Sequence, residues 1–244
     1  MPYSSVRLSD LERHELAPRG RLDVGIAVGQ AVSAVWTRRR TDGGRPEGPT
    51  VILAEAIAQR CGLDLNLVEF DSSGQIISHA TDGSWSLSFV PIDDERRRRV
   101  GVGPAYYAGV STYLVRAGMG LANVADVDSP SVRVVGVEGT ATLRSAVRSL
   151  TNIVPRSVVA LDEAVALFVA REVDAIALGR ESIQSLLGTV EGAAMVSGHF
   201  HKAETAVIVP RGRPAALAAT ERLMKTLKED GTIDAALSAY GLAP

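Results

Sequence analysis

The sequence predicts an α/β protein built from two lobes of similar topology. Short strands rich in β-branched residues alternate with helical segments along the chain, an order typical of layered α/β folds with parallel sheets. A strand–helix–strand unit near the N-terminus resembles in layout a second unit that starts near Val132. The length of 244 residues fits two small lobes or one large α/β unit.

The first unit contains two stretches that alternate in hydrophobicity, separated by a loop and a helix. Its expected elements are a strand at 22–28, a polar loop rich in glycine and proline at 37–49, a helix at 50–61 and a strand at 63–70. Thr50 is the expected N-cap of the helix, and Gly62 stands where a glycine commonly follows a helix. A crossover of this length implies parallel pairing of the two strands.

The rest of the chain repeats this alternation. The further elements expected are helices at 74–80, 140–150, 163–171, 214–229 and 233–240, and strands at 86–90, 132–137, 158–160, 173–178 and 206–209. Asp162 is the expected cap of the helix at 163–171. Residues 1–19 form an N-terminal arm, in which Leu8, Leu11 and Leu16 are candidate docking points.

Composition and charge exclude several classes of partner. The chain is 46% hydrophobic and 22% charged, with a net charge of −2, so it lacks the basic footprint of a protein that binds nucleic acid or an anionic membrane. Cys61 is the single cysteine and cannot form an internal disulfide. Its pattern favours a buried packing residue, with a reactive thiol as the alternative.

Localisation depends on where the natural chain begins. No apolar run approaches the roughly 20 residues that cross a bilayer. The first 19 residues are polar and lack the apolar core of a secretory signal. The protein is therefore expected to be periplasmic if a signal peptide has been removed, and cytoplasmic if Met1 is the native start.

The first candidate site follows the strand at 132–137. Gly139 makes a turn, and Thr140 and Ala141 open the next helix. Unpaired N–H groups and a partial positive charge at a helix N-terminus suit a carboxylate or phosphate. Under the alternative interpretation, Thr140 is only an N-cap.

The second candidate site follows the strand at 86–90. Asp93 is expected to cap a helical turn that carries four arginines, at positions 96–99. One arginine at the mouth of a strand could grip a carboxylate with its planar fork, although such runs more often form a solvated face.

The third candidate is Trp36 with Gln30, which could line a cleft after the first strand or simply pack on the following loop. Other motifs are incomplete. Gly25 and Gly29 lack the third glycine of a dinucleotide loop, and the pair His199 and His201 lacks a third ligand at a recognised spacing. No serine elbow is present. We therefore expect no catalytic residue, no cofactor and no metal.

Several stretches together resemble a known family, the bacterial extracellular solute-binding proteins of family 3, which serve amino-acid ABC transporters. The stretches that carry the resemblance are 53–58 with 62–63, 93–96 with Val100 and Tyr106, 125–127, 134–140, 163–164, 173–175, 230–232 and 241–242. They span residues 20–244. The aspartate at position 93 resembles a variant subfamily that often lacks a signal peptide.

The resemblance implies a two-lobed fold of the periplasmic-binding-protein-like type II, with two crossing hinge strands. Lobe 1 would comprise 20–108 and 202–244, and lobe 2 would comprise 109–201. A ligand would lie between the lobes, which close over it. An ABC permease is the implied protein partner, and no oligomeric state is implied.

The resemblance also implies site residues. Arg96 matches the arginine that binds the ligand carboxylate, and Thr140, with the N–H groups of Gly139 and Ala141, matches the carboxylate contact of the second lobe. Phe89 and Pro91 match positions whose backbone faces the ligand, and Gln30 falls near a wall residue.

Two departures from the family pattern concern the ligand. The family places an aspartate for the α-ammonium where this chain has Gly179, followed by Arg180. Pro91 has no N–H to donate where the family usually does. A carboxylate without the amine is therefore an alternative to an amino acid.

Three functions follow as hypotheses. The first is a solute-binding protein for ABC-type import or sensing that clamps a small carboxylate-bearing ligand by hinge closure. The second is a dehydratase of the cyclohexadienyl type, with Glu138 or Asp93 as general acid. The third is a cytoplasmic regulatory or interaction protein with an inherited fold.

Overall fold

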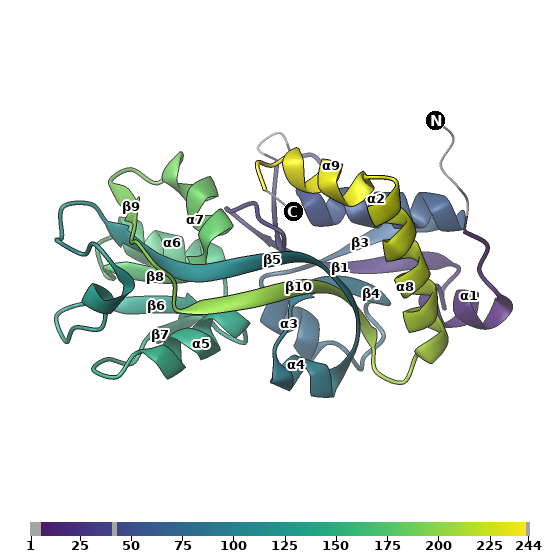
Figure 1. The fold of residues 1–244 in the computed structure, drawn as a ribbon, viewed down its shortest axis with the longest axis horizontal. Helices are drawn as coiled ribbons and strands as arrows, with labels where there is room; N and C mark the ends of the chain where they lie inside the picture. Colours follow the sequence, from purple (N-terminus) through teal and green to yellow (C-terminus); the bar gives the residue numbers. More distant parts are fainter. Residues whose placement is uncertain (1–5, 41–42, 243–244) are drawn as a thin grey trace.

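The computed structural model describes residues 6–40 and 43–242. Two groups of helices and strands are joined by the long strands β5 (Val100–Arg116) and β10 (His201–Pro210), which run side by side through the molecule (Figure 1). The two strands pair in antiparallel fashion. The two-lobed α/β arrangement expected from the alternating pattern is therefore confirmed, whereas the expected lobe boundaries fall inside these strands and stay a prediction.

The first lobe is built on a parallel sheet. Its strands are β1 (Arg21–Gly29), β2 (Trp36–Arg38), β3 (Asp64–Phe70) and β4 (Leu87–Pro91), and its helices are α2 (Pro49–Cys61), α3 (Ser73–Ser78), α4 (Asp94–Arg99), α8 (Pro214–Glu229) and α9 (Thr232–Ser238). Strand β1 pairs in parallel with β2, β3 and β4. The parallel pairing predicted for the first strand–helix–strand unit is confirmed.

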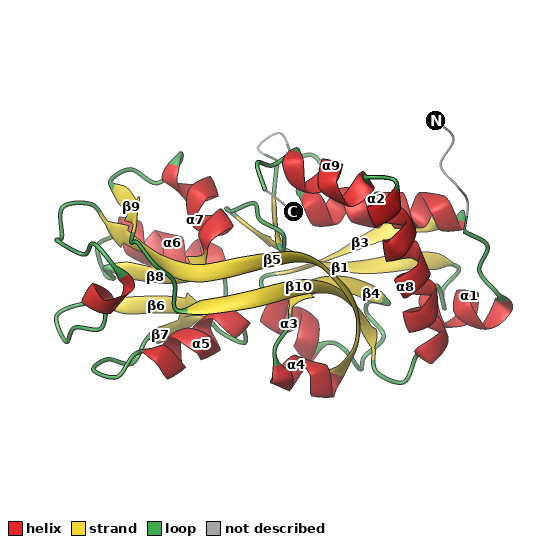
Figure 2. Ribbon diagram, viewed as in Figure 1, coloured by secondary structure: helices red, strands yellow, loops and turns green. Residues whose placement is uncertain are grey.

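The second lobe repeats the scheme. It contains β6 (Val134–Val137), β7 (Arg156–Val158), β8 (Ala175–Gly179), β9 (Ala193–Met195), α5 (Ala141–Ser149), α6 (Leu161–Val169), α7 (Arg180–Leu187) and the 3-10 helix η1 (Val124–Val127). Within the described residues, the main strand order is β2-β1-β4-β10-β5-β8-β6-β7, with β3 beside β1 and β9 beside β5. Helices pack on the sheet in both lobes (Figure 2).

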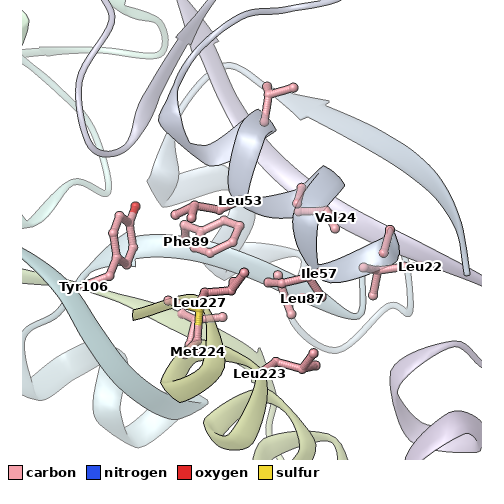
Figure 3. Close-up of a cluster of buried hydrophobic side chains, with 14 of the residues drawn as sticks. Leu22, Val24, Leu53, Ile57, Leu87, Phe89, Tyr106, Leu223, Met224 and Leu227 are labelled. Carbon is pink, nitrogen blue, oxygen red and sulfur yellow. The ribbon is translucent and has the colours of Figure 1, made fainter. Parts of the chain in front are cut away.

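The main core of the first lobe lies between its sheet and helices α2 and α8 (Figure 3). Leu53 and Ile57 of α2 and Leu223 and Leu227 of α8 are fully buried there, together with Leu87 of β4. These spacings of four residues place each pair on one helix face. In the described part of the chain, no helix is long and apolar enough to span a membrane.

The described part of the N-terminal arm packs onto the first lobe. Helix α1 (Asp10–Leu16) begins with a capping box formed by Ser9 and Glu12. The Glu15 carboxylate accepts a hydrogen bond of 2.9 Å from the Ala216 amide at the start of α8. Leu8 and Leu16 are buried, whereas Leu11 is 60% exposed. Two of the three candidate docking leucines therefore dock, and residues 1–5 lie outside the described residues.

Helix starts differ from two sequence predictions. Helix α2 begins at Pro49 with Gly48 as N-cap, so Thr50 lies within the first turn and is not the cap. Proline suits this first position because its fixed φ matches the helix and the missing N–H has no partner there. Helix α6 begins at Leu161 with Ala160 as N-cap, so Asp162 is not the cap. Gly62, with φ of 58°, does follow α2 as predicted.

Strand β5 is the largest element that the sequence patterns do not indicate. Proline and three glycines interrupt its alternation. Two of these glycines, Gly101 and Gly103, lie so close to β10 that a Cβ would come within 2.9 Å of the side chain of Val209 or within 2.8 Å of that of Val207. The strand also bulges, because Tyr107 pairs with Thr205 while Ala105 pairs with the next residue of β10.

Candidate functional site

A cavity of about 70 Å³ lies between the two lobes and against the hinge strands β5 and β10. Its wall consists of Ser33, Ala34, Val35, Trp36, Ser73 and Pro91 from the first lobe, Tyr107, Gly109, Val110, Ser111, Ala203 and Thr205 from the hinge strands, and Val137, Thr140, Thr142, Ala177, Leu178, Gly179, Glu181 and Ser182 from the second. Hydroxyl groups are frequent in this wall. Because one water needs roughly 10–15 Å³, the cavity suits a small polar molecule.

Among the described residues that form this wall, Glu181 is the charged one, and none is basic. The Tyr107 hydroxyl of β5 donates a hydrogen bond of 2.7 Å to Glu181 Oε1. Two glycines leave room for the carboxylate, since Oε2 lies 3.4 Å from where a Cβ would stand at Gly109 or at Gly179. The sequence patterns do not single out Glu181. The available signal is an acidic residue in the first turn of α7, two positions after the last residue of β8.

The N-terminus of α5 forms another part of the wall. Thr140 Oγ1 accepts a hydrogen bond of 3.1 Å from the Leu143 amide and donates one of 2.7 Å to the Val137 carbonyl. The predicted N-cap role of Thr140 is confirmed, and its one hydroxyl proton is donated to the Val137 carbonyl. The first N–H groups of a helix have no intrahelical acceptor and carry partial positive charge. This wall therefore offers a favourable place for an anionic group.

Arg96 lies directly behind the cavity wall. It is 1% exposed, and its guanidinium donates hydrogen bonds to the Pro91 carbonyl (2.7 Å), Ser73 Oγ (3.0 Å) and the Gly139 carbonyl (3.0 Å). Its Nε is buried and has no hydrogen-bond partner among the described residues. Burial, with a smaller contribution from the nearby Arg144 charge, lowers the pKa of Arg96 to about 9. Two of its partners, Ser73 and Pro91, line the cavity.

The other predicted site residues divide between the wall and its surroundings. Trp36, Pro91, Thr140 and Gly179 line the cavity. Gly139, Ala141 and Arg180 adjoin the second-lobe wall without lining it, and Ala141 is only 1% exposed.

Phe89 and Gln30 lie away from the wall. Phe89 stands opposite Val207 of β10, and its ring packs on Tyr106 with centroids 5.5 Å apart, because alternation along β4 turns this side chain into the core. Gln30 is exposed beyond the end of β1 and lines a separate surface groove with Arg38 and Arg39.

A cavity enclosed by two α/β lobes that share a pair of long strands defines a two-lobed solute-binding fold. The same fold occurs in an amino acid ABC transporter substrate-binding protein from Streptococcus pneumoniae bound to L-arginine (TM-score 0.81, 21% identity, 92% of this chain and 96% of that chain). It occurs also in a putative ABC transporter binding component from Wolinella succinogenes complexed with lysine (TM-score 0.80, 21% identity, 91% and 95%).

A third similar structure is an ancestral amino-acid-binding protein described as a precursor of cyclohexadienyl dehydratase (TM-score 0.81, 23% identity, 95% of this chain and 99% of that chain). The family model of the bacterial extracellular solute-binding proteins, family 3, matches residues 26–243. The chain therefore belongs to this family, and its fold is that of the periplasmic binding proteins. Among curated proteins, none matches the sequence.

Proposed function

We propose that this protein binds a small zwitterionic solute, an amino acid or a close relative, between its two lobes and serves ABC-type import or sensing. The observation that carries the proposal is the opposite polarity of two parts of the cavity wall. The N-terminus of α5, with Thr140 and the buried Arg96 of the first lobe nearby, suits a carboxylate, and Glu181 of α7, on the same lobe as α5, suits an ammonium group.

Glu181 compensates for the missing aspartate at position 179. Its carboxylate occupies the space beside Gly179, and Tyr107 holds one of the two oxygens, so the other is free to accept from a ligand N–H. A buried ammonium without an acceptor would be costly. The amino-acid ligands in the names of the two transporter relatives, arginine and lysine, support the same ligand class.

Binding is favoured over catalysis by the positions of the two candidate acids. Glu138 is exposed, and neither Glu138 nor Asp93 lines the cavity. Burial opposes ionisation of Asp93, but hydrogen bonds from Arg144 and from the Arg96 amide outweigh it and keep the pKa of Asp93 below its usual range. A general acid needs the opposite shift. An ABC permease remains the proposed partner.

The test is a binding panel of amino acids, matched acids without the amine and matched amines without the carboxylate, measured by thermal shift and calorimetry. An amino acid that binds is expected to stabilise the protein by roughly 2.7 kcal/mol at a hundredfold excess over Kd. Glu181→Gln is expected to weaken its binding at least about tenfold, because a hydrogen bond to a charged group is lost.

Glu191→Gln is the matched control, since Glu191 is exposed on the same lobe and does not line the cavity. It is expected to bind like the unmodified protein. If only acids without the amine bind, the proposed role of Glu181 is wrong. If no compound of the three groups binds, the whole proposal is contradicted.

A further inference from the structure

Beside the cavity, where α4 of the first lobe faces α5 of the second, side chains of the two lobes bond directly to each other. A further bond of 3.1 Å, from the Val32 amide between β1 and β2 to Ser185 Oγ of α7, also joins the lobes. Arg144 of α5 donates from Nε to Asp93 Oδ2 over 3.0 Å and makes a second bond to the same oxygen from Nη2. Its Nε also lies 3.1 Å from the carboxylate of Glu95. The Arg144 and Asp93 side chains are 24% and 13% exposed. Both side chains are still partly open to solvent, so high salt weakens this network, although less than it weakens a fully exposed ion pair.

The turn before α5 is held from both lobes. The Gly139 carbonyl accepts a bond of 3.0 Å from Arg96 of the first lobe and one of 2.9 Å from Arg144 of its own lobe. The backbone of Gly74 in α3 faces the same turn. A Cβ at position 74 would lie 2.7 Å from Gly139 Cα and 2.8 Å from the Glu138 carbonyl oxygen, closer than real Cβ atoms come. Glycine at position 74 therefore permits this approach of the lobes.

Asp93 uses its two carboxylate oxygens for different purposes. Oδ1 caps α4 by accepting a bond of 2.9 Å from the Arg96 amide, and Oδ2 faces Arg144 across the gap between the lobes. A hydroxyl residue could provide the cap but not the ion pair. An aspartate at this position thus serves both the local helix and the contact between the lobes.

We propose that Asp93 and Arg144, together with the close contact of Gly74 and Gly139, form a latch that holds the two lobes closed independently of the solute. All these contacts join protein groups to protein groups. They lower the free energy of the closed state by the same amount whatever the cavity contains. Because a solute must leave through an opened state, the latch also slows its exit.

The latch is tested on the free protein by small-angle scattering at low and high salt, with no solute added. We expect the unmodified protein to have a smaller radius of gyration at low salt than at high salt, because high salt screens the ion pair and lets the lobes open. Arg144→Gln and Asp93→Asn should be expanded already at low salt, and asparagine keeps the cap of α4. Arg97→Gln removes the same charge from an exposed position on α4 and should behave like the unmodified protein.

Gly74→Ala tests the same proposal by steric means. Alanine favours a helix more than glycine does, so α3 should form, while the added methyl group keeps Gly139 at a distance. We expect this variant to be expanded at every salt concentration, with helix content by circular dichroism unchanged. The double variant of Asp93 and Arg144 should expand no further than Arg144→Gln alone, because that single variant already removes the partner of Asp93 across the gap.

Equal radii of gyration for the unmodified protein, Arg144→Gln and Gly74→Ala at low salt would overturn the proposal. So would a radius of the unmodified protein that does not respond to salt. Neither result depends on which solute binds. The latch proposal can therefore be wrong while the proposed binding function is right, and the binding function can be wrong while the latch proposal is right.

Discussion

Asp174 shows how a single buried carboxylate ties two parts of the second lobe together. Its Oδ2 accepts bonds of 2.9 Å from both the Arg133 amide and Arg133 Nε, and its Oδ1 accepts one of 2.8 Å from Arg133 Nη2. The hydrogen bonds from the Arg133 side chain, which outweigh the effect of burial, hold the pKa of Asp174 below its usual range. The pair joins the start of β6 to the segment before β8.

Asp174→Asn is expected to lower the free energy of unfolding by about 1–2 kcal/mol at pH 7, because the charge-assisted bonds are lost. A carboxyl group whose pKa is lowered by folding stabilises above its unfolded value, near pH 4, and this contribution disappears as the pH falls through the folded value. The difference between the two proteins should therefore shrink below about pH 4 in urea unfolding.

Asp64→Asn is the control for that experiment, since Asp64 is exposed at the start of β3. Its unfolding curve should match that of the unmodified protein at each pH. If the free energies of unfolding of Asp174→Asn and the unmodified protein differ by the same amount at every pH down to pH 2, the role assigned to the Asp174 carboxylate is wrong.

Arg96 is a single residue that both adjoins the candidate site and holds parts of the fold together. Its guanidinium bonds to the end of β4, to α3 and to the turn of the second lobe. Removing it would take this buried donor from the Pro91 carbonyl and would leave the Gly139 carbonyl with the bond from Arg144 alone. Loss of binding in an Arg96 variant is therefore informative only beside a measurement of its folding, and Glu181→Gln is the cleaner probe of the cavity.

Among the elements, α1 is an integral part of the first lobe. Leu16 is fully buried against the core, and α1 packs on α8 through the Glu15 and Arg222 contacts. Leu16→Ala is expected to lower the free energy of unfolding by about 3 kcal/mol, as for other buried leucines. Leu11→Ala, at an exposed position of the same helix, should have almost no effect in the same denaturant titration.

An equal loss of stability in both leucine variants would mean that helix formation, and not packing on α8, is responsible. A negligible loss in both would mean that α1 does not dock in solution. Either result would contradict the assignment of the arm to the first lobe.

At the scale of the whole molecule, binding and closure rest on different residues. Glu181 belongs to the cavity wall, and Arg144 belongs to the contact between α4 and α5. With a binding amino acid from the panel, Arg144→Gln should raise the dissociation rate severalfold without changing the order of preference among amino acids. Glu181→Gln should change that preference without changing the radius of gyration. Stopped-flow kinetics measure the dissociation rates and the order of preference, and small-angle scattering measures the radius of gyration.

A variant that alters both properties together would contradict this separation. Such a result would mean that the cavity wall and the latch behave as one network. Arg97→Gln and Glu191→Gln again serve as controls, because both positions are exposed and lie outside the two groups.

Local signals in the sequence determined much of the fold. The caps at Asp93 and Thr140, the glycine after α2 and the alternating strands β1 and β3 depend on neighbours within a few residues, so the chain reveals them directly. The resemblance to the solute-binding family rests on the order of such signals and proved correct. Strand β5 was not predicted, because its glycines are needed for close contacts with β10 and interrupt the alternation of polar and apolar residues that indicates a strand.

Only the tertiary structure decided which of the polar residues meet. Tyr107 and Glu181 are 74 positions apart, and Asp93 and Arg144 are 51 apart, so their pairing depends on how the hinge strands bring the two lobes together. The same holds for Gln30 and Phe89. Their side chains are of a kind that can line a cavity, but the position of Gln30 beyond the end of β1 and the register of β4 at Phe89 turn them elsewhere. Residue type and local spacing specify helices and strands, whereas contacts across a cleft are set by the packing of whole lobes.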